Sequence, residues 1–182
     1  MSAQLSAIRA GGWTLFLDRD GVINRRLPGA YVQEWSTFEF LPGVEGAIAQ
    51  FTKCFDRIIV VTNQQGIGKG LMTLEDLQEI HDRMQAAIDH AGGRIDAVYA
   101  CPDLAKNDPP RRKPNIGMAL DAEADFPDID FTRAVMVGDS ASDLEFGRRL
   151  GMLLVLIEGK GERVPGDDYL TFPSLKAFAD QL

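Results

Sequence analysis

Two acidic residues two positions apart, Asp18 and Asp20, come directly after the apolar run WTLFL in the stretch WTLFLDRDGVIN. If the backbone stays extended through Asp20, both side chains point to the same side of the strand. Close carboxylates repel each other, so either one keeps its proton or a cation lies between them. The spacing therefore raises the question of what these two acids hold.

A third acid, Asp139, ends another apolar run, RAVMVGD. Carboxylate oxygens suit Mg²⁺, which keeps water positions that a phosphate can replace. A single aspartate at the end of a strand usually serves a turn or a cap, but three acids at two strand ends favour a metal site. Asp143, four residues after Asp139, could orient the water shell of that metal or simply favour the N-terminus of a helix.

Polar residues also end the run RIIVVTN, where Thr62 brings a hydroxyl and Asn63 an amide to the top of a buried strand. Backbone N–H groups of the glycines that follow can bind an anion. The basic triplet RRKP adds Lys113, a point charge for phosphate, and Arg112, a planar fork. Alone, such a triplet is usually a solvated surface. A phosphate-binding role is favoured only because the acids and the Thr62 hydroxyl are also present.

The glycine-rich stretch VTNQQGIGKG invites comparison with a phosphate-binding P-loop around Lys69. That motif needs a glycine six positions before the lysine and a serine or threonine directly after it. Here Asn63 and Gly70 occupy those positions, so the motif fails. We expect a flexible turn at Gly66-Ile67-Gly68.

Apolar strand-like runs alternate with helix-like stretches along the chain. This alternation predicts an α/β fold of the Rossmann-like, three-layer α/β/α type, with a mainly parallel sheet covered on both faces. Ligands bind at the carboxyl ends of the strands in such sheets, which is where the polar candidate residues named above are expected. The expected strands are 13–18, 57–63, 94–101, 133–139 and 152–157, and the expected helices are 44–55, 73–93, 115–126, 141–151 and 174–182.

The 182 residues fit a single domain, 1–182, and their net charge of −8 argues against a nucleic-acid partner. The two cysteines, Cys54 and Cys101, are too few for a disulfide scaffold. No apolar run reaches the roughly 20 residues that span a bilayer, and the N-terminus lacks the pattern of a signal peptide. We therefore expect a cytoplasmic protein with no membrane partner, as a monomer or a weak homo-oligomer.

Taken together and in chain order, these motifs resemble the haloacid dehalogenase (HAD) superfamily of phosphohydrolases. The matching residues are Asp18, Asp20, Thr62, Lys113, Gly138, Asp139 and Asp143. The resemblance implies that Asp18 is a nucleophile forming an aspartyl-phosphate and that Asp20 is the general acid and base. It further implies that Mg²⁺ is held by Asp18, the backbone carbonyl of Asp20 and Asp139. Thr62, Asn63 and Lys113 would hold the phosphoryl oxygens, with Asp143 supporting the metal site from behind.

A closer resemblance is to small members without a cap domain, the heptose 1,7-bisphosphate and histidinol-phosphate phosphatases. DRDGVIN, YVQEWSTFEFLPGV, VTNQQGIGKG and RRKPNIGM carry it, and residues 24–42 are too few to fold as a cap. It implies a Mg²⁺-dependent phosphomonoesterase acting on a sugar phosphate, with heptose 1,7-bisphosphate as the leading substrate. Because Arg112 adjoins Lys113, we expect its planar fork to contact the sugar or a second phosphate. The alternatives are a histidinol-phosphate phosphatase, a nucleic-acid 3′-phosphatase, and a non-catalytic regulatory module on the same fold.

The chain departs from that subgroup at the loop before the basic triplet. The heptose enzymes usually carry a zinc-binding loop there, and this chain retains one thiol, Cys101. A structural zinc site needs four N or S ligands in most cases. We therefore expect no structural zinc, and we expect His81 and His90 to be surface residues.

Overall fold

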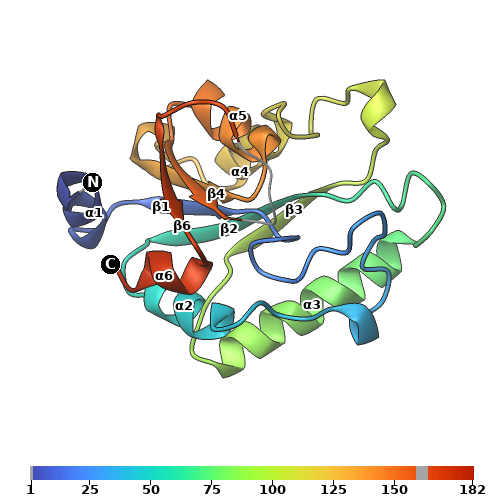
Figure 1. Ribbon diagram of the computed structural model, residues 1–182. Helices are drawn as coiled ribbons and strands as arrows, with labels where there is room; N and C mark the ends of the chain where they lie inside the picture. The colour runs from blue at the N-terminus through green and yellow to red at the C-terminus, as the bar shows by residue number, and fades with distance from the viewer. Residues whose placement is uncertain (1, 159–163) are drawn as a thin grey trace.

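The structure, a computed structural model, describes residues 2–158 and 164–182. Its described part contains a sheet whose strands are all parallel, in the order β3-β2-β1-β4-β5-β6 (Figure 1). β1 lies at the centre between β2 and β4, where the chain reverses its direction of travel across the sheet. The strands are β1 (Thr14–Leu17), β2 (Arg57–Asn63), β3 (Ala97–Cys101), β4 (Ala134–Gly138), β5 (Leu153–Ile157) and β6 (Tyr169–Phe172).

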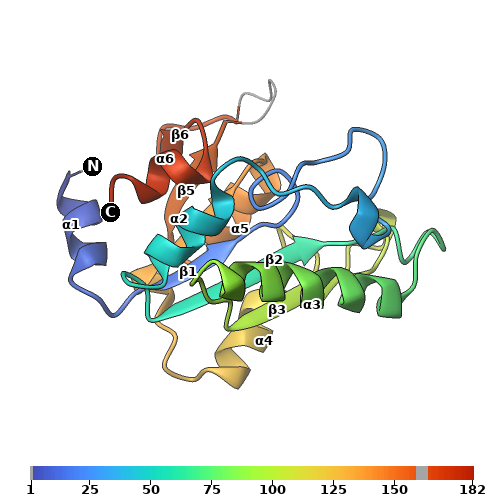
Figure 2. The same ribbon diagram turned by 90° about the horizontal axis from the view of Figure 1, so that it is seen from below.

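Helices cover both faces of this sheet, so the expected three-layer architecture is confirmed. α4 and α5 lie on one face, and α2, α3 and α6 lie on the other (Figures 1 and 2). The helices are α1 (Ser2–Arg9), α2 (Val44–Phe51), α3 (Leu74–His90), α4 (Gly117–Asp125), α5 (Ala141–Arg149) and α6 (Leu175–Ala179).

The strands are continuously apolar because each face of the sheet has its own core. In β2, Ile58 and Val60 join the core under α2, α3 and α6, whereas Ile59 and Val61 join the core under α4 and α5. Successive side chains of a strand point to opposite faces, so a strand buried on both sides needs apolar residues at every position. The same pairing puts Leu17 level with Val60 of β2 and Val137 of β4, so these strands end at one edge.

The observed elements differ from the expected ones in a few places. The strand expected from residue 94 begins at Ala97, and the helix expected through residue 55 ends at Phe51 and continues as a turn. α1 and β6 were not expected at all. β6 is a four-residue edge strand after a Pro-Gly-Asp-Asp turn, too short for its periodicity to be recognised. Within the described residues, no helix combines the length and apolarity needed to cross a membrane.

Candidate active site

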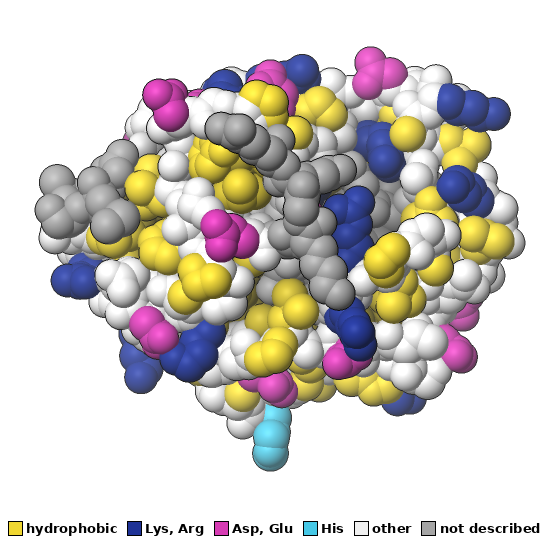
Figure 3. Space-filling view, in the orientation of Figure 1, with side chains coloured by type: hydrophobic (Ala, Val, Ile, Leu, Met, Phe, Trp, Pro, Cys, Tyr) yellow, Lys and Arg dark blue, Asp and Glu magenta, His cyan; other side chains and the backbone are white. Residues whose placement is uncertain are grey.

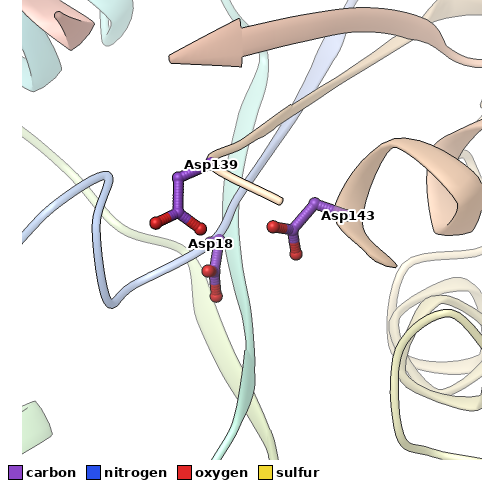
Figure 4. Close-up of side chains that lie close together, drawn as sticks. All are labelled: Asp18, Asp139 and Asp143. Atoms are coloured by element: carbon purple, nitrogen blue, oxygen red, sulfur yellow. The ribbon is translucent and has the colours of Figure 1, made fainter. Parts of the chain in front are cut away.

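Three carboxylates converge at the carboxyl edge of the sheet. Asp18 follows β1, Asp139 follows β4, and Asp143 lies in the first turn of α5; one oxygen of each lies within 4.8 Å of the others (Figure 4). Within the part of the chain that the structure describes, this is the one group of three or more His, Cys, Asp or Glu side chains close enough to share an ion. Asp143 was expected to support the metal site from behind, and its carboxylate lies in the same group as those of Asp18 and Asp139.

The local sequence explains how Asp143 reaches this position. Ser140 and Asp143 form a capping box at the start of α5, in which the Ser140 N–H donates to Asp143 Oδ2 at 3.1 Å. Gly138 lets α5 approach β4 closely, because a Cβ at residue 138 would overlap the Asp143 side chain. The GDSASD stretch therefore combines a strand end, a helix cap and two acids in a few residues.

Lys113 is the buried cation of the site. Its Nζ lies 2.8 Å from Asp18 Oδ1 and 2.6 Å from Asp143 Oδ1, and it donates to the Val61 carbonyl at 2.7 Å. Burial favours the neutral amine, but the charges of Asp143 and Asp18 outweigh it and raise the pKa of Lys113 above its ordinary value. The lysine therefore stays charged and offsets part of the repulsion among the acids.

The remaining repulsion among the acids contributes to the pKa values of Asp18 and Asp139. Burial, with the nearby Asp143 and Asp139 charges, raises the pKa of Asp18 to about 7 even though Lys113 opposes the shift. Burial and the Asp143 charge raise the pKa of Asp139 to about 6, against the opposing charges of Arg26 and Lys113. Burial is the largest cause of both shifts, and the charges of the neighbouring acids add to it. A bound cation would lower both pKa values, which is the chemistry expected of residues that hold one.

Asn63 contacts the backbone of Lys113 on both sides. Its Oδ1 accepts from the Lys113 N–H at 3.0 Å, and its Nδ2 donates to the Lys113 carbonyl at 3.1 Å. The side chain therefore positions Lys113 in this structure. That Asn63 also binds the phosphoryl group stays a prediction.

Thr62 and Asp20 are linked through a residue that the sequence did not single out. The Nε2 of Gln64 donates to Thr62 Oγ1 at 2.8 Å and to Asp20 Oδ2 at 2.7 Å. Gln64 follows Thr62 by two positions, and in an extended chain this spacing puts both on the same side. That spacing is the one signal in the sequence that could have identified it.

Asp20 does not join the acidic trio with its side chain. It accepts hydrogen bonds from Arg19 Nη2 at 3.1 and 3.0 Å and from Asn24 Nδ2 at 2.9 Å, besides the one from Gln64. Burial would raise the pKa of Asp20, but the Arg19 charge and these hydrogen bonds lower it below its usual value. That its backbone carbonyl binds a metal stays a prediction.

The expectation that His81 lies on the surface is wrong, whereas His90 is exposed. His81 lies on the inner face of α3, among the buried positions Leu77, Ile80, Met84 and Ile88. Its Nε2 is 3.1 Å from Arg19 Nη1. Burial and the Arg19 charge together lower the pKa of His81 to about 3. The helical spacing was the available signal, but the partner of His81 lies too far away in the sequence to be inferred.

The site opens into a cavity of about 530 Å³ whose walls include Thr62, the acids and Lys113. Basic side chains surround its mouth, where Figure 3 shows Lys and Arg side chains in and around a hollow. The basic residues of this rim are Arg26, Lys69 and Arg112. Nη1 of Arg112 is buried without a hydrogen-bond partner among the described residues.

Gln65 ties together the three segments that form the rim. Its Nε2 donates to the Tyr31 hydroxyl at 2.9 Å, and its Oε1 accepts from the Ala105 N–H at 3.3 Å. Lys69, from the stretch that failed the P-loop pattern, lies with its Nζ 5.1 Å from the centre of the Tyr31 ring. The rim is therefore a connected structure, built from the β1–α2, β2–α3 and β3–α4 connections.

Comparison with known proteins gives these residues a family. A family model described as "HAD-hyrolase-like" matches residues 110–170. A Mycobacterium tuberculosis protein named D-glycero-alpha-D-manno-heptose-1,7-bisphosphate 7-phosphatase is 43% identical over 145 residues, covering 79% of this chain and 76% of its own. This chain belongs to the HAD-like phosphatase family. It is therefore a phosphoric monoester hydrolase, as expected from the sequence.

Other members of the family cover more of the chain. A Pseudomonas putida D-glycero-beta-D-manno-heptose-1,7-bisphosphate 7-phosphatase is 38% identical over 174 residues, or 92% of this chain and 98% of its own. The crystal structure of the D,D-heptose 1,7-bisphosphate phosphatase from B. bronchiseptica, complexed with magnesium and phosphate, matches with a TM-score of 0.84 and 32% identity. It covers 93% of this chain and 97% of that one. The fold and the family resemblance are thus both confirmed.

Proposed function

We propose that the protein is a Mg²⁺-dependent phosphatase of D-glycero-D-manno-heptose 1,7-bisphosphate that removes the 7-phosphate. The observation that carries the proposal is the convergence of Asp18, Asp139 and Asp143 beside Lys113, at the base of a cavity with a basic rim. The names of the relatives from M. tuberculosis and P. putida support the choice of substrate.

Asp18, Asp139 and Asp143 would hold the Mg²⁺, together with the backbone carbonyl of Asp20. The donor set fits this ion, because it consists of oxygens whose mutual repulsion a divalent cation relieves. The bound ion would neutralise charge on the phosphate and on Asp18, which otherwise opposes attack.

In the proposed reaction Asp18 attacks phosphorus, the bond to the ester oxygen breaks, and an aspartyl-phosphate forms. Oδ1 of Asp18 faces Lys113, so the lysine fixes the orientation of the attacking carboxylate. Asp20 in its protonated form, which the lowered pKa of this residue makes the minor one, gives a proton to the ester oxygen as it leaves. It then takes a proton from the water that releases phosphate. Lys113, Thr62 and Asn63 would stabilise the charge on the phosphoryl oxygens.

The rim would select the substrate. With the 7-phosphate at the acids, the sugar and its 1-phosphate lie toward the mouth of the cavity, where Arg26, Lys69 and Arg112 are. Arginine presents a planar fork suited to phosphate oxygens, and lysine presents a point charge. We further propose that residues 1–182 act as a single domain and as a monomer or weak homo-oligomer, to be tested by light scattering.

Phosphate release from a substrate panel tests the proposal. The panel contains both anomers of heptose 1,7-bisphosphate, histidinol phosphate, a 3′-phosphorylated oligonucleotide and para-nitrophenyl phosphate, each with Mg²⁺ and with EDTA. We expect the highest kcat/KM on one heptose anomer and loss of turnover in EDTA. Faster turnover of histidinol phosphate or the oligonucleotide would reassign the substrate, and no turnover of any compound would favour the regulatory module.

A further inference from the structure

Arg19, between the two aspartates assigned to the chemistry, is an unusual residue to find inside a protein. Its side chain has 0% exposure, and its Nη2 donates to both carboxylate oxygens of Asp20, at 3.1 and 3.0 Å. Burying a guanidinium is costly unless its charge and its donors are matched. A buried arginine at this position therefore needs a partner for its second terminal nitrogen, Nη1, since its Nε has no hydrogen-bond partner among the described residues.

His81 of α3 is that partner, with Nε2 3.1 Å from Arg19 Nη1. A guanidinium nitrogen can only donate, so Nε2 of His81 is the acceptor and the ring is neutral, with its proton on Nδ1. Neither Arg19 nor His81 lines the cavity. Among the described residues, the hydrogen bonds that link His81 to the site run through Arg19 and then through Asp20.

The backbone of Arg19 has a separate role. Its carbonyl accepts from the N–H groups of Ile23 at 2.8 Å and Asn24 at 3.0 Å, which closes the turn after β1. Asn24 and Gln64 hold Asp20 from other directions, through one oxygen each. The guanidinium contacts both oxygens of Asp20, so together with Asn24 and Gln64 it fixes the rotation of the carboxylate.

We infer that Arg19 and His81 are positioning residues for proton transfer by Asp20, with His81 orienting the guanidinium and the guanidinium orienting the carboxylate. The inference rests on the proposed role of Asp20. In that role the phosphorus–ester bond breaks as phosphorus bonds to Asp18, and the ester oxygen takes the proton of Asp20. Misorientation of Asp20 slows this step most when the leaving oxygen is a poor leaving group that needs the proton.

The test compares leaving groups in His81 variants. A sugar phosphate expels an alkoxide and needs protonation, whereas para-nitrophenyl phosphate expels a stable phenolate. The measured quantity is kcat/KM, which reports the steps up to transfer of phosphorus to Asp18. We expect His81→Leu to lose about 10- to 100-fold on the sugar phosphate and at most about 3-fold on para-nitrophenyl phosphate. His81→Gln, whose amide oxygen can accept from Arg19, should recover most of the loss.

The controls separate positioning from general destabilisation. Ile88→Ala removes buried volume at the far end of the same face of α3, beside Gly93, and should not discriminate between the two substrates. Should His81→Leu not fold, His81→Asn is the replacement, because its shorter amide leaves Arg19 without the acceptor. Equal losses on both substrates, or no loss on either, would overturn the inference.

Failure of the proposed function would look different. Asp20→Asn should abolish turnover of the sugar phosphate, and full activity in that variant would remove both the role of Asp20 and the inference. If Asp20→Asn behaves as expected while the His81 variants do not discriminate between leaving groups, only the positioning inference is wrong.

Discussion

Asp18, the proposed nucleophile, is buried and held in a fixed orientation. One oxygen faces Lys113 at 2.8 Å, and burial, with the charges of the neighbouring acids, raises the pKa of Asp18 to about 7. The carboxylate is thus held in place at a cost in electrostatic free energy that a bound metal and substrate would relieve. The chemistry at this residue can be tested separately from the fold.

We expect Asp18→Asn to abolish phosphatase activity while leaving the fold intact. The amide is nearly isosteric with the carboxylate, but it is a poor nucleophile and a poor metal ligand. A loss of three orders of magnitude in kcat would correspond to about 4 kcal/mol of barrier. Steady-state turnover and the circular dichroism spectrum of the purified variant check this expectation, and wild-type turnover would contradict the covalent mechanism.

Arg112 differs from Lys113, its neighbour, in being partly exposed on the rim with one buried nitrogen that has no described partner. We expect Arg112→Lys to lose most of the activity on the best sugar substrate, because lysine cannot reproduce a bidentate contact. Para-nitrophenyl phosphate offers no sugar or second phosphate, so its turnover should change much less. Kinetics on both substrates give the comparison.

Two other results would contradict this role of Arg112. Equal losses on both substrates would place Arg112 on the transferred phosphoryl group. Unchanged kinetics on both would make it a solvated loop residue.

At the scale of elements, the sequence predicts the framework better than the contacts. The strands β1, β2, β4 and β5 carry continuous apolar runs, and polar residues mark where they end, so the edge holding Asp18, Thr62 and Asp139 could be located in advance. β6 and α1 are short and peripheral, and nothing in their composition sets them apart. The local sequence pattern is therefore enough to predict an element that is long and buried.

Contacts between distant elements were beyond such reasoning. His81 was expected on the surface because the sequence of its helix gives no sign of a partner. The partner is Arg19, which follows β1, 62 positions earlier in the chain. Arg19 and Gln64 were not predicted either, because their partners His81 and Asp20 come from other elements of the fold. A sequence pattern identifies residues that repeat a known motif, but pairing through the core depends on the completed sheet.

α5 packs closely against β4 at Gly138, and a substitution at this glycine tests whether the close packing is required. An added Cβ would overlap Asp143 Cβ and lie 2.5 Å from its Cγ, so either the helix or the acid must move. We expect Gly138→Ala to lower the free energy of unfolding by about 1–3 kcal/mol. Because Asp143 moves, the variant should also lose Mg²⁺-dependent activity.

Gly46 in α2 is the matched control, because a Cβ there meets nothing within 4 Å. Gly46→Ala should raise the free energy of unfolding by about 0.5–1 kcal/mol, since alanine favours the helix. Urea unfolding measures both variants. A Gly138→Ala protein as stable and active as wild type would show that the close approach is not required.

At the scale of the whole molecule, an acidic protein concentrates positive charge around one cavity. The chain carries a net charge of −8, yet the cavity combines the acids with Arg26, Lys69, Arg112 and Lys113. The rim comes from three connections at one edge of the sheet, tied through Gln65. A parallel sheet with a central first strand thus delivers both the acids and the rim to the same place, and the metal would complete the charge balance.

Mg²⁺ should therefore stabilise the whole fold in a pH-dependent manner. The pKa values of Asp18 and Asp139 are raised in the folded state to about 7 and about 6, so the folded protein binds more protons than the unfolded chain between about pH 4 and pH 7. These groups make the metal-free protein less stable as the pH rises through that window. A metal must displace the same protons, so Mg²⁺ binds more weakly below the folded pKa values.

We accordingly expect 10 mM MgCl₂, about the concentration needed for a millimolar site, to raise the Tm more at pH 8 than at pH 5.5. Thermal unfolding at both pH values, with NaCl at matched ionic strength as the control, measures the difference. Asp139→Asn should reduce the Mg²⁺-induced rise at pH 8, because it removes one of the proposed ligands. An equal rise at both pH values, or one that NaCl reproduces, would mean that the cation does not bind at these carboxylates.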